Sequence, residues 1–246
     1  MHRMHRPAFL AGVIALAIAG FAQTASADLL RPNDKREFPD ITAFANGYQN
    51  YSYNASTGLG VFQLSNAPFL LTNGKTAGGT YDEAPVVAND GGIKSQTVTA
   101  VLDAQGHLVD SPLNSFAIYG KVTVDGQTYS GLLLQGTPTA FGSQTLKPAV
   151  GNEDLFDLKL QITGGALAGL YGANAYMRVT SEANSTFDGI FTTDFASEKV
   201  LTNTHALSSL LPQPAPEPTA LYVLLAAGAG LFYRGRRRIA SRDLQP

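Results

Sequence analysis

The chain has 246 residues, of which 17 are Lys or Arg and 19 are Asp or Glu, and it contains no cysteine. Without cysteine the protein has no disulfide scaffold, no thiolate nucleophile and no cysteine-ligated metal site. The formal net charge of −2 argues against nucleic-acid binding, because phosphate contacts need a basic surface. We therefore expect no nucleic-acid partner.

Residues 1–27 have the three parts of a secretory signal peptide. Arg3 and Arg6 give a positive start, and residues 8–22 form an uncharged, mostly apolar stretch that is short for a membrane-spanning helix. The small residues of the cleavage site and the first residue after it are Ala25, Ala27 and Asp28. We expect export through the Sec translocon and cleavage by signal peptidase, with an uncleaved N-terminal anchor as the alternative.

Residues 28–211 are predicted to form one acidic, β-rich ectodomain. Between residues 28 and 218 there are 10 Lys or Arg and 18 Asp or Glu, a formal net charge of −8. Apolar and polar residues alternate from Phe156 to Thr163, which is the period of a half-buried strand. The pair Asp125-Gly126 lies between β-forming residues and favours a two-residue hairpin turn. We predict an all-β fold, either a single antiparallel β-sandwich or an open barrel.

The expected elements follow one another with frequent turns. Strands are predicted at 98–102 (with a return at 107–109), 122–124, 127–129, 156–162, 176–180 and 186–195. Clusters of Gly, Asn, Asp and Pro predict loops at 73–79, 89–92, 136–138 and 148–152. One short helix is predicted at 166–171.

Three tyrosines within six residues are the best candidates for ligand binding in the ectodomain. They are Tyr48, Tyr51 and Tyr53, and Asn and Gln residues flank them. On a strand, Tyr51 and Tyr53 share one side and could stack on sugar rings while the amides bind hydroxyl groups. This pattern supports a carbohydrate-binding module that acts on extracellular polysaccharide. Tyrosines also fill sheet cores with their hydroxyl at the edge, and this structural role is the one we favour for the three residues, with sugar binding as the alternative.

The acidic groups give weaker signals for chemistry. They are Glu153, Asp154 and Asp157 at a strand start, Asp82-Glu83 in a loop, and Asn89-Asp90 before two glycines. Such groups could form a glycosidase carboxylate pair or hold Ca²⁺. The mature region has two histidines, His107 and His205, which we expect at the surface. We predict solvated turn residues, and therefore no enzyme, no catalytic residue, no metal site and no cofactor, with Ca²⁺ as the alternative.

The C-terminal 35 residues have three parts. A proline-rich stalk spans 212–218, an uncharged segment spans 219–233, and a basic stub spans 234–246. Fifteen helical residues cover about 22 Å, so a transmembrane helix at 219–233 needs local thinning of the bilayer or snorkelling side chains. The cluster that would hold this end in the cytoplasm is Arg234, Arg236, Arg237 and Arg238.

The order of these parts carries a family resemblance. Pro216, Glu217 and Pro218, followed by a short apolar helix and an arginine cluster, resemble a PEP-CTERM sorting signal. Ala215 stands where that family often has Val, and residues 239–246 extend past the arginines.

In the family, an exosortase recognises and cleaves the tail in bacteria that make extracellular polysaccharide. The resemblance implies a protein that passes through the inner membrane to the cell surface, outer envelope or medium, with a non-catalytic structural or adhesive β-domain. A plain single-pass anchor with a proline-rich stalk is the alternative.

Overall fold

The computed structural model describes residues 28–33, 37–146, 153–181 and 184–207. The predicted signal peptide before Asp28 lies outside the described residues. The sorting motif, the transmembrane helix and the arginine cluster also lie outside them. The structure therefore tests the ectodomain only.

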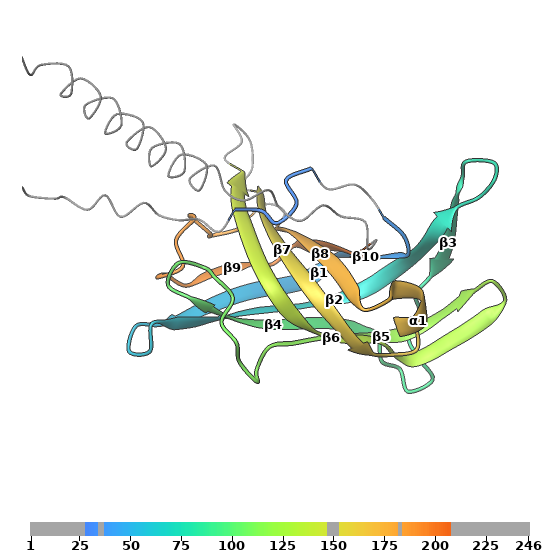
Figure 1. The fold of residues 1–246 in the computed structure, drawn as a ribbon, viewed down its shortest axis with the longest axis horizontal. Coiled ribbons are helices and arrows are strands. Elements are labelled where there is room, and N and C mark those ends of the chain that lie inside the picture. Colours follow the sequence, from blue (N-terminus) through green and yellow to red (C-terminus); the bar gives the residue numbers. More distant parts are fainter. Residues whose placement is uncertain (1–27, 34–36, 147–152, 182–183, 208–246) are drawn as a thin grey trace, which may run out of the picture. The chain divides into compact units, whose positions relative to one another are not determined.

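Eight antiparallel strands close into a barrel in the order β1-β2-β4-β5-β6-β7-β8-β10, with β10 returning to β1 (Figure 1). These strands are β1 (Asp40–Asn54), β2 (Leu59–Lys75), β4 (Ser95–Asp103), β5 (Ser115–Val124), β6 (Gln127–Leu146), β7 (Glu153–Gly164), β8 (Asn174–Ser181) and β10 (Val200–Ala206). Outside the ring, β3 (Tyr81–Pro85) pairs with β2, and β9 (Phe195–Ser197) pairs with β1. The helix α1 (Ala168–Tyr171) connects β7 to β8.

Several local predictions are confirmed. The strands at 98–102, 156–162 and 176–180 lie within β4, β7 and β8. Asp125 and Gly126 both have positive φ, as a type I′ turn between β5 and β6 requires. The all-β class is confirmed as well, and the barrel is closed rather than a sandwich or an open barrel.

Several segment predictions are wrong. Residues 73–75 of the loop expected at 73–79 lie in β2, and Asp82 and Glu83, also expected in a loop, lie in β3. Residues 136–138, expected as a loop, lie inside β6, where a register shift at Pro138 and Ala140 accommodates the missing proline N–H. Residues 186–194, expected as a strand, form an irregular loop, and only residues 195–197 pair with β1. The aromatic residues of that loop point into the barrel, so burial rather than strand pairing explains their hydrophobicity.

Aromatic rings fill the barrel at the end where β1 and β2 are joined. The rings of this aromatic cluster belong to Tyr51, Phe62, Phe141, Phe156, Phe187, Phe191 and Phe195. Their neighbouring centroids lie 4.6–6.0 Å apart, which is the range of favourable ring contacts. The 184–194 loop contributes Phe187 and Phe191, so this loop forms part of the core.

A polar layer lies deeper in the barrel. The amide of Gln96 donates to the Thr202 and Thr204 hydroxyl oxygens at 3.2 and 3.4 Å, and the amide of Asn66 donates to Thr202 at 3.1 Å. At the opposite end, α1 closes the barrel with the buried residues Leu167 and Tyr171. The Tyr171 hydroxyl donates to the Thr204 carbonyl oxygen at 3.0 Å. The described interior is thus occupied by side chains from one end to the other.

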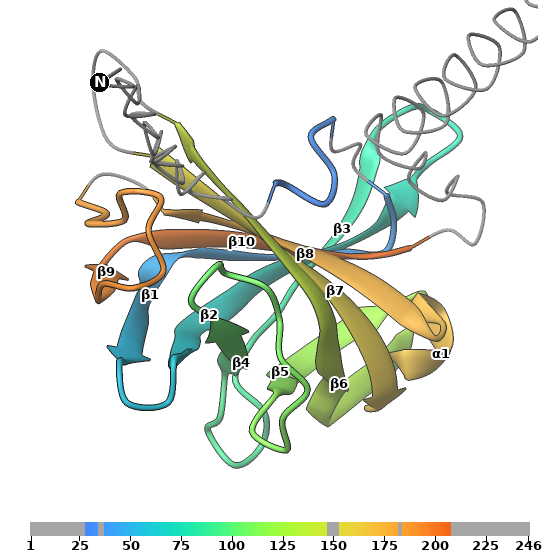
Figure 2. The same ribbon diagram turned by 60° about the vertical axis from the view of Figure 1, so that its left-hand side comes forward.

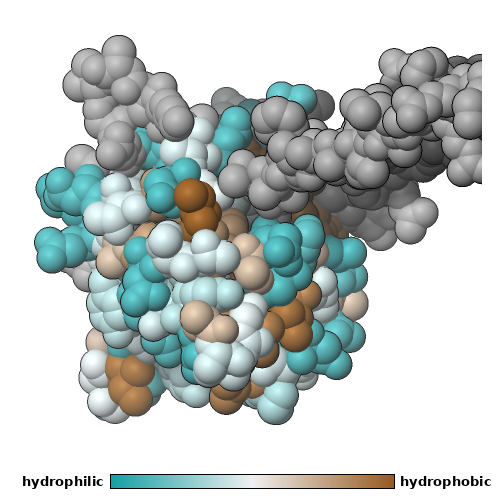
Figure 3. Space-filling view, turned by 90° about the vertical axis from the view of Figure 1, so that its left-hand side faces the viewer, coloured by the Kyte–Doolittle hydropathy of each residue, from teal (hydrophilic) through white to brown (hydrophobic). Residues whose placement is uncertain are grey.

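The outer surface at the aromatic end is mixed. Figure 3 shows hydrophobic side chains that stand apart from one another among hydrophilic and neutral ones.

Within the part of the chain that the structure describes, no helix has the length and apolar character needed to cross a membrane.

Candidate functional site

The first residues after the predicted cleavage site pack on the outside of the barrel. Residues 28–33, which we name the strap, run beside β6, β7 and β8 (Figures 1 and 2). A Cβ atom at Gly142 of β6 would overlap the carbonyl oxygen of Asp28, so glycine is what allows this close approach. Leu29 is buried against the wall. The strap is therefore part of the folded domain.

A network of charged and aromatic groups connects the strap to the outer wall. Its members, which we name the outer network, are Arg31, Glu37, Asp157, Tyr176, Arg178 and His205. Arg178 pairs with both carboxylate oxygens of Asp157, at 2.9 and 3.0 Å, and the Asp157 side chain is fully buried. This bidentate geometry is the strong form of a carboxylate–guanidinium pair.

The backbone and side chain of Arg31 both enter the outer network. Its N–H donates to Asp157 at 3.2 Å, and its carbonyl oxygen accepts from Arg178. Its guanidinium lies 5.1 Å from the centre of the Tyr176 ring and pairs with Glu37 at 2.8 Å. One residue of the strap thus contacts three strands of the wall.

His205 lies at the base of the outer network. It is 1% exposed, and its Nε2 lies 3.0 Å from Nη1 of Arg31, which places an acceptor nitrogen opposite the guanidinium. Burial, and after it the positive charge of Arg31, lowers the pKa of His205 to about 4. The prediction of a surface histidine is therefore wrong for His205, whereas His107 is exposed beside Asp103 at 3.2 Å.

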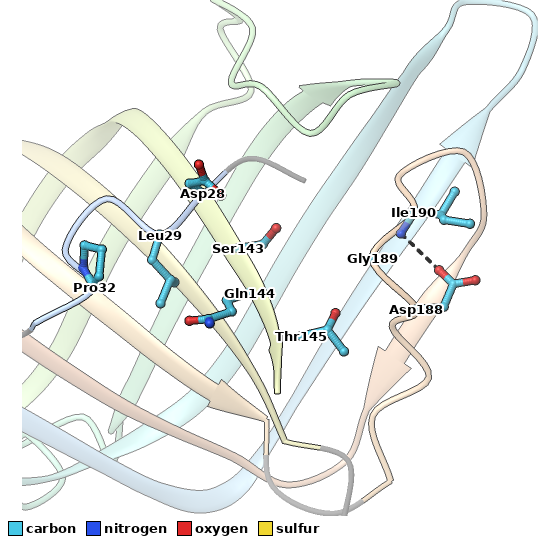
Figure 4. A pocket seen from close by; sticks show the side chains of 9 residues that line it. All are labelled: Asp28, Leu29, Pro32, Ser143, Gln144, Thr145, Asp188, Gly189 and Ile190. Carbon is cyan, nitrogen blue, oxygen red and sulfur yellow. Dashed lines mark hydrogen bonds between the residues drawn. The ribbon is translucent and has the colours of Figure 1, made fainter. Parts of the chain in front are cut away.

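A cleft of about 640 Å³ opens between the strap, the end of β6 and the loop at 188–190 (Figure 4). Its lining residues are Asp28, Leu29, Pro32, Ser143, Gln144, Thr145, Asp188, Gly189 and Ile190. The side chains of Ser143 and Thr145 point toward the loop, and that of Gln144 points toward the strap. Asp188 is held in place because it accepts the Ile190 N–H at 3.0 Å.

Asp154 lies behind the cleft. It is the cross-strand partner of Thr145, so the two side chains share one face of the β6–β7 pair. Asp154 is fully buried, and neither of its carboxyl oxygens has a hydrogen-bonding partner. Burial raises the pKa of Asp154, and the nearby hydroxyls of Ser185 and Thr145 oppose this rise in part. The Thr145 hydroxyl oxygen is buried and unpartnered as well.

The three candidate tyrosines do not form one surface. Tyr51 and Tyr53 share a face of β1, as predicted, but that face is the inner one. Tyr51 is buried, stacks on Phe195 and donates its hydroxyl to the Phe191 carbonyl oxygen at 2.8 Å. The favoured core role is therefore confirmed for Tyr51, and the alternative sugar platform is wrong for this residue, because the strand turns this side into the barrel. Tyr48, on the opposite face, is 59% exposed.

The acidic groups are distributed over separate places. Glu153 is exposed, Asp154 faces the barrel end and Asp157 faces the strap, because successive residues of a strand alternate between its faces. Asp82 and Glu83 lie on the exposed strand β3, and Asp90 pairs with Lys121 at 2.8 Å. The described residues include no group of three or more His, Asp or Glu side chains that could hold a metal ion.

Sequence reasoning missed the strap and the outer network. The alternation in β7 places Asp157 on one face of the strand and Phe156 and Leu158 on the other. This pattern was the sequence signal for a charged outer wall. The partner residue Arg31 lies 126 positions away from Asp157, a separation that no local pattern indicates. Comparison of the chain with family models, with curated proteins and with solved structures gave no match.

Proposed function

We propose that this chain is an exported, non-catalytic envelope or matrix protein that an exosortase sorts through its C-terminal tail. The observation that carries the proposal is the order of signal peptide, ectodomain, Pro216-Glu217-Pro218, apolar segment and arginine cluster. A closed barrel filled by side chains agrees with a structural role for the ectodomain.

The strap supports the N-terminal part of this proposal. Asp28 is the first residue after the predicted cleavage site, and its carbonyl oxygen lies against Gly142 of β6. Cleavage after Ala27 removes the apolar stretch and leaves the barrel contacts of residues 28–33 intact. In this scheme the mature protein begins with the strap.

Replacement of Pro216, Glu217 and Pro218 by alanine tests the sorting step. We expect the variant to keep its tail and stay in the membrane fraction, while the native protein has a mass that begins at Asp28 and ends near the motif. A matched control replaces Pro212 and Pro214, which lie in the same stalk outside the motif. Unchanged release of the motif variant would refute the exosortase proposal, and an intact tail in the native protein would indicate a permanent anchor.

Polysaccharide binding is the second candidate, and one surface observation favours it. Phe44, Tyr48 and Phe69 on β1 and β2 are 49–59% exposed, and the rings of Phe44 and Phe69 lie 5.1 Å apart. Exposed aromatic faces can stack on sugar rings. These three residues, which we name the aromatic strip, replace the predicted tyrosine platform as the candidate sugar-binding surface.

The second candidate is tested on a panel of immobilised polysaccharides, with and without Ca²⁺. Retention of the native protein and its loss in the Phe44→Ala and Tyr48→Ala variants would support binding at the aromatic strip. The control is Leu113→Ala, which removes a side chain of similar exposure from another part of the surface. Absence of retention on every polysaccharide would remove this candidate.

A further inference from the structure

The barrel interior holds six buried polar side chains whose contacts with one another leave hydrogen-bonding groups over. Three amides and three hydroxyls face inward from five strands, and each of these residues is at most 6% exposed. We name this set the amide layer, and its members are Gln49 on β1, Asn66 on β2, Gln96 on β4, Ser181 on β8, and Thr202 and Thr204 on β10.

Each amide of the layer binds a hydroxyl with one of its two polar ends. The side-chain nitrogens of Asn66 and Gln96 donate to the Thr202 hydroxyl oxygen at 3.1 and 3.2 Å. The side-chain oxygen of Gln49 accepts from the Ser181 hydroxyl at 3.1 Å. The other end of each amide is buried and has no protein partner, and these atoms are Asn66 Oδ1, Gln96 Oε1 and Gln49 Nε2. Buried polar atoms nearly always have a partner, so three such atoms in one layer indicate a bound group.

The strand register places the three amides on neighbouring inner positions. Asn66 and Gln96 are cross-strand partners in the β2–β4 pair, and their nitrogens share one acceptor. Gln49 pairs with Leu64, which lies two residues before Asn66 on the same face of β2. Gln49 and Asn66 are thus diagonal neighbours, a separation that long side chains can span. A group between the three amides can therefore contact all of them.

We propose that one internal water molecule binds at the centre of the amide layer. Its two hydrogens donate to Asn66 Oδ1 and Gln96 Oε1, and its oxygen accepts from Gln49 Nε2. Three hydrogen bonds are the usual number for a buried water. Water also fits an amide that is turned by 180°, because it can donate or accept at each contact.

Charged occupants fit this site less well. A metal cation requires oxygen ligands, whereas the free end of the Gln49 amide presents N–H groups. An ammonium group has only donors and offers Gln49 no acceptor. The six residues of the amide layer are all uncharged, so they provide no charge to compensate a buried ion. The donor and the two acceptors together match a neutral molecule that both donates and accepts.

The proposed water connects two sets of bonds at the place where the ring closes. Asn66 and Gln96 join β2 and β4 to β10, and Gln49 joins β1 to β8. Both sets reach across the pair of β10 and β1 that closes the barrel. A water that binds all three amides links the two sets into one network, so it belongs to the closure of the barrel.

Crystal structures of the native protein and of one variant test the proposal. The native electron density should show one peak within hydrogen-bonding distance of all three amides. In Gln49→Met a methyl group takes the place of the donor nitrogen, so this peak should be absent. The matched control is Gln63→Met, which makes the same exchange at an exposed position of β2 and should keep the peak.

The native structure alone can overturn the proposal, even if Gln49→Met does not fold. Density in which the amides bind one another directly, or in which no peak lies between them, would refute it. A peak whose contacts are all oxygens at about 2.3–2.6 Å would identify a cation instead of water. A peak that is unchanged in Gln49→Met would show that Gln49 does not hold the molecule, which also contradicts the proposed site.

Discussion

The two faces of strands β7 and β8 are stabilised by opposite kinds of interaction. On the inner face, Phe156 and Leu158 of β7 and Met177 of β8 are fully buried among apolar neighbours. On the outer face, Asp157 and Arg178 pair across the same two strands, and the strap covers them. One pair of strands therefore has an apolar wall and a charged wall that are separated only by the backbone.

The two walls differ in the kind of contact that stabilises them. Apolar contacts have no required direction, and the inner face is completed by many rings from several strands. The outer face depends on a few directional contacts, and one residue of the strap, Arg31, makes four of them. The inner wall should therefore respond mainly to lost volume, and the outer wall to lost partners, to pH and to displacement of the strap.

The largest effect is expected for Phe156→Ala on the inner wall. Phe156 contacts the rings of Phe62, Phe141, Phe187 and Phe195. Truncation of a buried Phe costs about 3–5 kcal/mol of the free energy of unfolding, which urea titration measures. Leu113→Ala, at a site that is 60% exposed, is the control and should change stability by less than about 0.5 kcal/mol. Similar losses in both variants would contradict the role of the aromatic cluster.

The pH dependence of stability tests the outer wall. The pKa of His205 is lowered from 6.5 to about 4 in the folded protein, so between these values the unfolded chain takes up a proton that the folded chain does not. Acidification from pH 6.5 to 4 should therefore reduce stability through this residue, by up to about 3 kcal/mol.

A variant isolates this contribution from that of the carboxylates. The charged groups that face His205 are Arg31, Glu37, Asp157 and Arg178. His205→Gln keeps a polar side chain and removes the titration, so urea titrations at several pH values should show a flatter profile between pH 4 and 6.5. Parallel profiles of the native protein and the variant would refute the assignment.

A smaller loss is expected when one partner of the buried ion pair is removed. Asp157→Asn keeps the shape of the side chain but leaves Arg178 without its carboxylate, which should cost about 2–3 kcal/mol of the free energy of unfolding. The control is Asp90→Asn, whose ion pair with Lys121 is exposed and contributes less than about 1 kcal/mol. Equal effects in urea titrations of the two variants would show that burial of the pair is unimportant.

Much of the barrel could be predicted from local patterns. The alternation in β7 and the Asp125-Gly126 turn both indicated their elements, because side-chain period and turn geometry are local properties. Closure of the ring could not be predicted this way, since it depends on β10 returning to β1 over more than 150 residues. The prediction of a strand at 186–194 is wrong because a loop that buries aromatic side chains has the same composition as a strand.

The sites were harder to predict from the sequence than the fold, for the same reason. Glu153, Asp154 and Asp157 were recognised as an acidic group, but their division among solvent, barrel end and strap follows from the pleat of the strand and from distant partners. For the tyrosines, the alternation of a strand predicted that Tyr51 and Tyr53 share one face. It did not establish that this face points into the barrel.

The smallest predicted effect concerns the contact between strap and barrel. In Gly142→Ala the new Cβ overlaps the Asp28 carbonyl oxygen, so the start of the strap must move while the inner wall is unchanged. We expect a loss of about 1 kcal/mol in the free energy of unfolding and faster proteolysis within residues 28–33, measured by mass spectrometry.

Gly169→Ala in α1 is the matched control, because its Cβ would meet nothing within 4 Å. If Gly142→Ala left the strap as resistant as it is in the native protein, the docking of residues 28–33 would not depend on this contact. If it exposed the strap but left urea unfolding unchanged, the strap would be a separable cover rather than part of the cooperative unit. The expected result, a shared loss of strap protection and stability, would mean that the charged wall folds together with the apolar one.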